Sequence, residues 1–204
     1  MAASLLAFVL AAGLLTVTPG VDTALVLRAA TVEGTRRAAL AALGIGLGCL
    51  VWGAAVAVGL AALLNSAPLA YALLSWAGAA YLCWLGLRML LRPRSSMQHG
   101  AEAAAASGRA WFLRGLLGNL LNPKIGVFYV SFLPQFVPAG MAPGAWTFGL
   151  ACLHVLMGLL WCALLIGATR PLGRVLRRPA VVRWLDRLTG GVFIGFGVKL
   201  ALSR

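Results

Sequence analysis

Charged residues are scarce in this chain of 204 residues: they make up only 10% of it, and just 4 are Asp or Glu. A soluble domain is about a quarter charged and about half apolar, whereas 62% of these residues are hydrophobic and the mean hydropathy is +0.95. So many apolar side chains cannot be buried inside a small globule, which excludes an ordinary soluble domain. The composition predicts a protein embedded in lipid.

Histidine and cysteine are also few, and they form no cluster that could carry out catalysis. His154 has no second His, Cys or carboxylate at metal-ligand spacing, and the sequence has no Ser/His/Asp grouping and no Cys-X-X-Cys pair. It therefore predicts no enzyme, no metal site and no cofactor. His154 is interpreted as a packing or helix-bonding residue. The cysteines are interpreted as small buried hydrophobes: Cys49, Cys83, Cys152 and Cys162.

Basic residues, in contrast, give a net charge of +13, which raises the question of nucleic-acid binding. The arginines argue against it, because they occur in three groups separated by apolar stretches and no basic–aromatic surface motif accompanies them. Basic loops on the cytoplasmic side are typical of multi-pass membrane proteins. We expect contacts with anionic lipids and no nucleic-acid partner. The groups are Arg28, Arg36 and Arg37; Arg88, Arg92, Arg94, Arg109 and Arg114; and Arg170, Arg174, Arg177, Arg178, Arg183 and Arg187.

Six apolar stretches reach the roughly 20 residues needed to cross a bilayer. The arginine groups fall after the first, third and fifth, so these connections are expected in the cytoplasm and both termini outside. Because the Met1 end has no basic n-region, the first stretch is expected to stay rather than be cleaved. The last stretch carries four charged residues, mostly near one end, where long side chains can reach the interface. The stretches are 4–27, 38–64, 67–91, 112–137, 144–169 and 180–202.

The two halves of the chain resemble each other. "GLGCLVW" (46–52) matches "GLACLHV" (149–155), and "GAAYLCWLGLRML" (78–90) matches "GGVFIGFGVKLAL" (190–202). Since each half has three spans, an odd number, the halves must be inverted relative to each other. The alternative is chance similarity among Gly- and Leu-rich helices. The sequence thus predicts an all-α polytopic membrane protein with six transmembrane helices in a 3+3 inverted repeat, divided into a first repeat (1–93), a cytoplasmic linker (94–110) and a second repeat (111–204).

Helices 1 and 4 are predicted to be broken, at Pro19 and at Pro123. Proline removes a backbone donor and frees carbonyl groups, which in lipid need a protein-lined or wet cavity. Each break is followed by a charge deep in its span, Asp22 in the first and Lys124 in the fourth. An ionisable residue within the membrane is a functional hypothesis by default. The alternative is a structural pair or a tolerated kink.

At these residues the chain resembles the lysine-exporter (LysE/RhtB) family of bacterial amino-acid efflux transporters. The matching segments are "TPGVDTALVLR", "GTRRAALAALGIGLG", "GAAYLCWLGLRML" and "LLGNLLNPKIGVFYVSFLPQFV". Three departures are Val21, where the family usually has a second proline, Asp22, where relatives often have Asn although Asp also occurs, and the absence of an acidic residue near Cys49. The resemblance implies a secondary exporter of amino acids or related metabolites in the bacterial inner membrane, driven by a proton or ion gradient. The candidate substrate-binding residues are Thr18, Pro19, Gly20, Asp22, Thr23, Asn122, Pro123 and Lys124.

In the mechanism that we expect, Asp22 attracts the ammonium group of the substrate or exchanges a proton with it. Lys124, or free amide groups near Pro123, receives the substrate carboxylate. The rival hypothesis is a membrane thiol–disulfide electron carrier, because Cys49 and Cys152 hold matching positions in the repeat and could face each other. The sequence leaves the substrate, the coupling ion and the oligomeric state open, a homodimer included.

Overall fold

The computed structural model describes residues 2–66, 68–93, 107–168, 175 and 178–202. These residues form helices and connecting turns, and no strand occurs among them. The elements are α1 (Ala2–Val17), α2 (Val21–Arg28), the π-helical turn η1 (Ala29–Glu33), α3 (Thr35–Ser66), α4 (Pro68–Leu91), α5 (Gly108–Leu120), α6 (Pro123–Val127), the π-helical turn η2 (Phe128–Phe132), the 3-10 turn η3 (Leu133–Phe136), α7 (Pro143–Gly167) and α9 (Pro179–Leu202).

The described residues of all six apolar stretches are mainly helical, and the breaks expected in the first and fourth are confirmed. The segments Ser4–Val17 and Val21–Glu33 meet at a bend of 54°, as do Gly108–Leu120 and Lys124–Phe136. Among the described residues, Thr35–Gly59 and Pro143–Gly167 are long and apolar enough to cross a membrane, and each bent pair adds one such span, which makes up to four. The structure therefore supports a helical membrane protein, and it leaves the count of six spans as a prediction.

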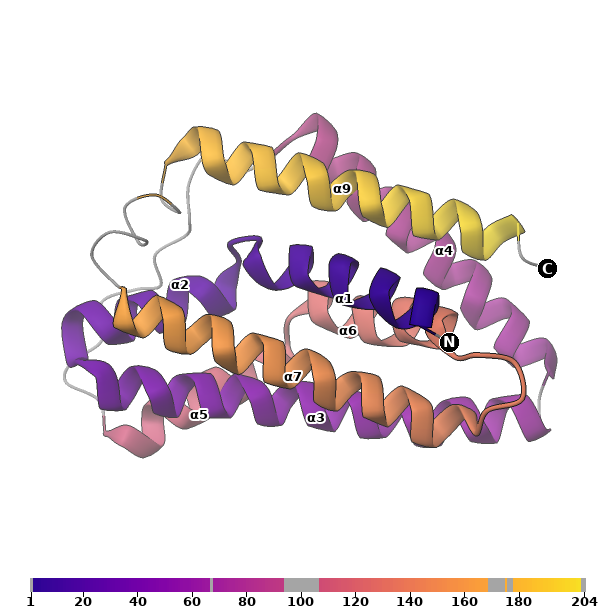
Figure 1. The fold of residues 1–204 in the computed structure, drawn as a ribbon, viewed down its shortest axis with the longest axis horizontal. Coiled ribbons are helices and arrows are strands. Elements are labelled where there is room, and N and C mark those ends of the chain that lie inside the picture. Colours follow the sequence, from indigo (N-terminus) through magenta and orange to yellow (C-terminus); the bar gives the residue numbers. More distant parts are fainter. Residues whose placement is uncertain (1, 67, 94–106, 169–174, 176–177, 203–204) are drawn as a thin grey trace.

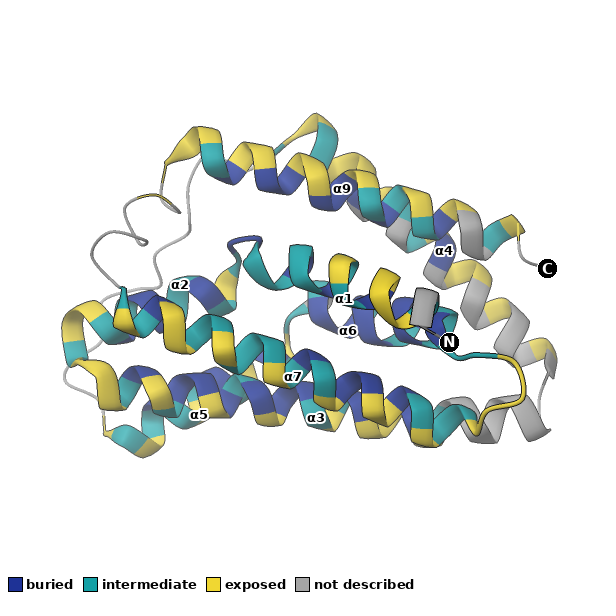
Figure 2. Ribbon diagram, in the orientation of Figure 1, coloured by how far each residue is buried: buried dark blue, intermediate teal, exposed yellow. Residues whose placement is uncertain are grey.

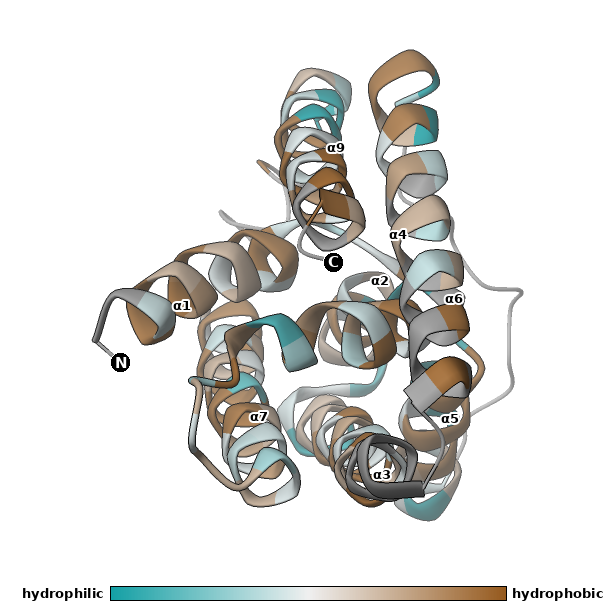
Figure 3. Cartoon of the chain, turned by 90° about the vertical axis from the view of Figure 1, so that its right-hand side faces the viewer, coloured by the Kyte–Doolittle hydropathy of each residue, from teal (hydrophilic) through white to brown (hydrophobic). Residues whose placement is uncertain are grey.

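The helices run roughly side by side, and α4 and α9 form a pair that stands to one side of the others (Figures 1 and 3). At one end of the molecule, on the left in Figure 1, lie the junction of η1 with α3, the start of α5, the end of α7 and the start of α9. Both chain termini lie toward the other end. The end with the helix junctions, called here the arginine end, therefore carries Arg36, Arg37, Arg109 and Arg183.

Large apolar side chains are exposed on the outside of most helices (Figure 2). Examples are Leu10, Val58 and Leu160, which are 66%, 72% and 63% exposed. In water such a surface would drive aggregation, whereas lipid solvates it. The buried faces turn inward onto a core rich in aromatic side chains, among them Phe8, Phe128, Tyr129, Phe132 and Phe136. The molecule is thus apolar both inside and outside, as a lipid-embedded bundle must be.

Glycines let α3 lie in direct contact with α5. A Cβ atom added at Gly44 would fall 2.1 Å from the carbonyl oxygen of Phe112, and one added at Gly115 would fall 2.1 Å from that of Ala41. Since neither backbone oxygen can move aside, only glycine fits at these two positions. Such close approach of helices over small residues is typical of membrane proteins. It fixes α5, and therefore the second break, against α3.

The expected linker, 94–110, falls mainly on residues 94–106, which lie outside the described residues. In its last part, Ser107 accepts a hydrogen bond from the amide of Ala110 and caps α5, which begins at Gly108. A serine side chain at this position satisfies a helix-end donor that would otherwise lack a partner. The helix that contains the start of the fourth apolar stretch therefore begins before residue 112, where the hydropathy pattern places the start of that stretch.

Candidate functional site

The first break separates α1 from α2 over residues 18–20. Pro19 has no N–H to donate to the carbonyl of Leu15, so the α-helical ladder cannot continue through it. The hydroxyl of Thr18 donates to the carbonyl oxygen of Leu14 at 2.6 Å and lies 2.6 Å from the hydroxyl of Thr189 in α9. Because Thr18 has one hydroxyl hydrogen, its donor is already used. Thr18 thus fixes the end of α1 against α9.

The second break is completed by its own side chains. Asn122 accepts a hydrogen bond through Oδ1 from the amide of Lys124 at 3.1 Å, and its carbonyl accepts from the amides of Ile125 and Gly126. Pro123, the first residue of α6, has no N–H at all. The start of α6 therefore has no free amide for a ligand. This corrects the expectation that amides near Pro123 would receive a substrate carboxylate.

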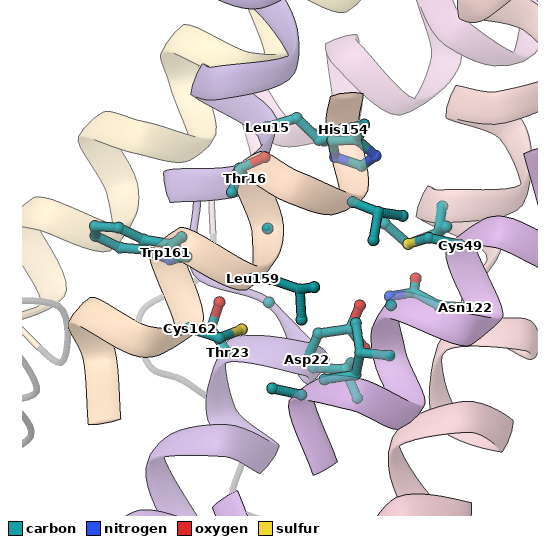
Figure 4. Close-up of a pocket in the computed structure, with 18 of the residues that line it drawn as sticks. Leu15, Thr16, Asp22, Thr23, Cys49, Asn122, His154, Leu159, Trp161 and Cys162 are labelled. Carbon is teal, nitrogen blue, oxygen red and sulfur yellow. The ribbon is translucent and has the colours of Figure 1, made fainter. Parts of the chain in front are cut away.

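A cavity of about 90 Å³ is lined by the two broken helices together with the helices α3 and α7 (Figure 4). Since one water needs about 10–15 Å³, the cavity has room for several water-sized groups, about the size of a small amino acid. Figure 4 shows Asp22, Asn122 and Cys49 on one side of it and Trp161 and Cys162 of α7 on the other. Residues from opposite halves of the sequence thus surround one space.

The structure brings most of the predicted site residues to this cavity. Pro19 is buried and is not part of the lining, and the side chain of Pro123 lies outside the described part of the chain. Asp22 and Lys124 line the same cavity. The predicted residues in its wall are Thr18, Gly20, Asp22, Thr23, Asn122 and Lys124.

Asn119, which the sequence reading missed, is the direct partner of Asp22. Its amide Nδ2 donates to Oδ2 of Asp22 at 2.9 Å, while its Oδ1 accepts a hydrogen bond from the thiol of Cys49 at 3.6 Å. Asn119 is completely buried, in a space that Gly48 leaves open: a Cβ there would lie 2.7 Å from Oδ1 of Asn119. One signal was available in the sequence, since a polar side chain within an apolar span is expensive and is usually functional.

His154 also lines the cavity. The sequence interpretation of a helix-bonding histidine is confirmed, since Nδ1 of His154 lies 2.9 Å from the hydroxyl of Tyr129 in η2. Both side chains are buried. The interpretation did not foresee that the histidine faces the same space as Asp22.

The cysteines do not form the pair that the rival hypothesis needs. Cys49 is buried in the cavity wall, whereas Cys152 is exposed on α7 and is not among the lining residues. Both thiols are free. A thiol–disulfide carrier requires two cysteines that can approach each other, and this arrangement gives it no support.

A second cavity of about 350 Å³ lies between α3, α4 and the segment from α6 to η2. Its wall includes Trp52, Tyr81 and Ser131. Asn122 lines both cavities. The second break therefore stands between two spaces, and a movement of α6 would change the separation between them.

Comparison with known proteins gives one family for the chain. Residues 14–204 match the family model described as LysE type translocator. The chain is similar to the threonine efflux protein of Escherichia coli K12 (32% identical, covering 91% of each chain) and to the leucine efflux protein of Klebsiella pneumoniae (30% identical, covering 96% of this chain and 93% of the relative). It is also similar to an uncharacterized membrane protein of Vibrio cholerae, at 32% identity over 98% and 97% of the two chains. No solved structure was found to match.

Proposed function

The chain belongs to the family of LysE type translocators, and from this membership we propose that it exports amino acids across the bacterial inner membrane in exchange for protons. The observation that carries the proposal is the cavity between the broken helices, which holds one carboxylate and one ammonium group, Asp22 and Lys124. A zwitterionic amino acid carries the same two charges. The cavity can therefore pair both ends of such a substrate.

The substrate ammonium group binds to Asp22, which Asn119 orients through its hydrogen bond. The carboxylate binds to Lys124 or to the first turn of α2. That turn follows the N-cap residue Gly20, which has no side chain to cap it, and residues 20–23 all line the cavity. The start of a helix carries partial positive charge and attracts carboxylates, and broken transporter helices use it in this way.

The substrate is a neutral amino acid with a small or apolar side chain. Of the described lining residues, Asp22 is the only acid, so a second ammonium group, as in lysine, would have no acidic partner there. The remaining wall contains Leu15, Ile45 and Leu159 together with the hydroxyls of Thr16 and Thr23. Such a lining suits threonine and leucine, for which two of the relatives are named.

Proton exchange follows from competition at Asp22. The carboxylate pairs with the substrate ammonium group or with a proton, but not with both. Release of the substrate to the outside leaves a buried carboxylate, and taking up a proton there lowers the cost of burying it. The protonated carrier then returns to the cytoplasmic side, where the next substrate displaces the proton. Alternating access of this kind needs a movable element, and the two bent helices supply one.

The six-span topology belongs to this proposal, with residues 1–93 and 111–204 as two inverted repeats. Two observations support it. The second helix of each half packs against that of the other, α3 on α7, and the third helices pair likewise, α4 on α9. The arginine end lies opposite both termini (Figure 1), as the positive-inside rule requires for cytoplasmic loops and outer termini.

The test is transport by the purified protein in proteoliposomes. Vesicles are loaded with radiolabelled threonine, leucine, lysine or glutamate, and efflux is measured with and without a proton gradient directed into them. We expect gradient-stimulated efflux of threonine and leucine, and at least about tenfold slower efflux of lysine and glutamate, which equals about 1.4 kcal/mol of discrimination. Protein-free vesicles are the control. Equal efflux of all four, or none, would contradict the proposal.

A further inference from the structure

His154 is held in one orientation at the cavity. Its Nδ1 atom is fixed by the hydroxyl of Tyr129 at 2.9 Å, and its ring lies against that of Phe128, with 5.1 Å between centroids. Tyr129 and Phe128 are completely buried. A hydrogen bond to one ring nitrogen fixes the orientation of the ring and the direction of the other nitrogen. Nε2 therefore has a fixed position in the cavity wall, and the tautomer depends on whether the Tyr129 hydroxyl donates or accepts.

A continuous series of polar contacts joins His154 to Asp22. The Tyr129 hydroxyl lies beside the thiol of Cys49 as well as His154. The thiol donates to Asn119, and the amide of Asn119 donates to Asp22. Five elements contribute one residue each, and both ends of the series line the cavity. A packing histidine would need no such connection to the only acid of the cavity wall among the described residues.

His154 lies at the inner end of the cavity, away from the arginine end. The lining residues of α7 run from His154 to Cys162, toward the arginine end, and those of α3 run from Ala42 to Cys49, away from it. His154 and Cys49 therefore mark the same limit of the cavity. Phe128 and Tyr129, which contact His154, belong to the aromatic core that closes this side. In the proposed topology that core separates His154 from the outside.

We propose that His154 is a second proton-binding residue of the transport cycle, which receives the proton that enters from the outside and passes it to Asp22. This inference rests on the proposed function. The neutral imidazole accepts the proton at one ring nitrogen and becomes imidazolium, and Tyr129 then accepts a hydrogen bond from Nδ1–H. When the substrate has left Asp22, the proton moves through cavity water to the carboxylate, and the imidazole is neutral again.

The charges around His154 determine when this transfer takes place. The groups that face it are Tyr129 from η2, Cys49 from α3, Lys124 from α6 and Asp22 from α2. Asp22 attracts the imidazolium and Lys124 repels it. While a substrate pairs with both residues, these influences are balanced. After release, the carboxylate of Asp22 no longer pairs with a substrate and can take up the proton, while the ammonium group of Lys124 repels the imidazolium.

The test separates proton coupling from substrate exchange in proteoliposomes. His154→Asn places an amide near the position of Nδ1, so the contact with Tyr129 can persist while the titratable ring is lost. We expect threonine counterflow without a gradient to stay within about twofold of wild type, and threonine transport driven by a proton gradient to fall at least about tenfold. Unchanged driven transport, or an equal loss of both activities, would overturn the inference.

Two further variants complete the test: the first controls for the integrity of α7, and the second examines the contact at Nδ1 of His154. Leu156→Ala alters an exposed residue of the same helix that does not line the cavity, and it should leave both activities unchanged. Tyr129→Phe removes one hydroxyl and keeps His154, so driven transport should persist with its pH midpoint displaced by at least about half a unit. An undisplaced midpoint would also overturn the inference. Absence of threonine counterflow in the wild type would overturn the proposed function itself, and this inference with it.

Discussion

The two helix breaks have the same bend of 54° and different chemistry. At the second, Asn122 caps α6 and proline occupies the first helical position, so the local backbone groups are satisfied. At the first, the N-cap of α2 is Gly20, which has no side chain to cap the helix, and the second residue of the helix is Asp22. The second break thus completes its own hydrogen bonds, whereas the first presents its backbone and its charge to the cavity.

This difference assigns separate tasks to the two breaks. Because Asn122 caps α6, the second break can bend the helix and position Lys124 without a bound ligand. The first leaves polar groups in a cavity, and in lipid such groups need a partner. Substrate, proton or water must therefore supply what the chain does not. We propose that binding is concentrated at the first break, and that the second mainly provides shape.

The largest effect is expected from Asp22→Asn. The amide keeps the size of the side chain but cannot pair with an ammonium group or exchange a proton at neutral pH. Losing one partner of a buried charge pair costs about 2–5 kcal/mol, so gradient-driven efflux of threonine should fall at least about 30-fold. Threonine efflux from reconstituted vesicles, with a proton gradient directed into them, measures this loss. Full driven efflux in this variant would remove Asp22 from the mechanism and make the two breaks equivalent.

Lys124→Gln should have a smaller effect. The uncapped first turn of α2 lines the same cavity and can share the substrate carboxylate. We expect KM for threonine to rise about tenfold, or about 1.4 kcal/mol, with the maximal rate retained. Initial rates over a range of internal threonine concentrations measure both. If Lys124→Gln abolished transport as fully as Asp22→Asn, the second break would bind the substrate as strongly as the first.

Much of this arrangement could be predicted from the sequence, because its causes are local. Pro19 and Pro123 break a helix wherever they occur within one, and the charges that follow them are visible in the chain. The helical stretches follow from apolar length alone. It was harder to predict which backbone groups at each break are already hydrogen-bonded. The sequence suggests free amides near Pro123, where Asn122 in fact caps the helix.

Contacts between distant residues could not be predicted in the same way. Asn119 lies 97 positions from Asp22, and the packing of α2 and α5 against α3 and against each other brings the two together. The partnership of Tyr129 with His154 likewise depends on where η2 meets α7. The predicted sixth span is a different case, because Arg183 and Arg187 lower the hydropathy of α9. Helix length and composition therefore do not identify α9 as a span, although it is helical from Pro179 to Leu202.

Gly48→Ala tests the first break indirectly. The added methyl group would fall 2.7 Å from Oδ1 of Asn119 and would push this side chain away from Asp22. Overpacking of this kind costs about 1–3 kcal/mol. Since Asp22 itself stays in place, we expect driven threonine efflux to fall by roughly three- to tenfold, less than in Asp22→Asn.

Gly59→Ala is the matched control, because it makes the same change in the same helix and a Cβ there meets nothing within 4 Å. It should transport like the wild type. Equal loss in the two variants would mean that α3 tolerates no alanine at glycine positions, and the contact between Asn119 and Asp22 would then not explain the result.

The smallest effect on transport is expected at the second break, from Asn122→Ala. Removing a helix cap costs about 1 kcal/mol, so the thermal unfolding temperature of the detergent-solubilised protein should fall by a few degrees. Asn122→Ser keeps an oxygen that can cap α6 and should restore most of this loss. Because the amide of Lys124 already occupies Oδ1 of Asn122, KM for threonine should keep its wild-type value in both variants. A rise of KM in the alanine variant that serine does not reverse would show that Asn122 binds the substrate, and the separation of binding from shape would fail at that residue.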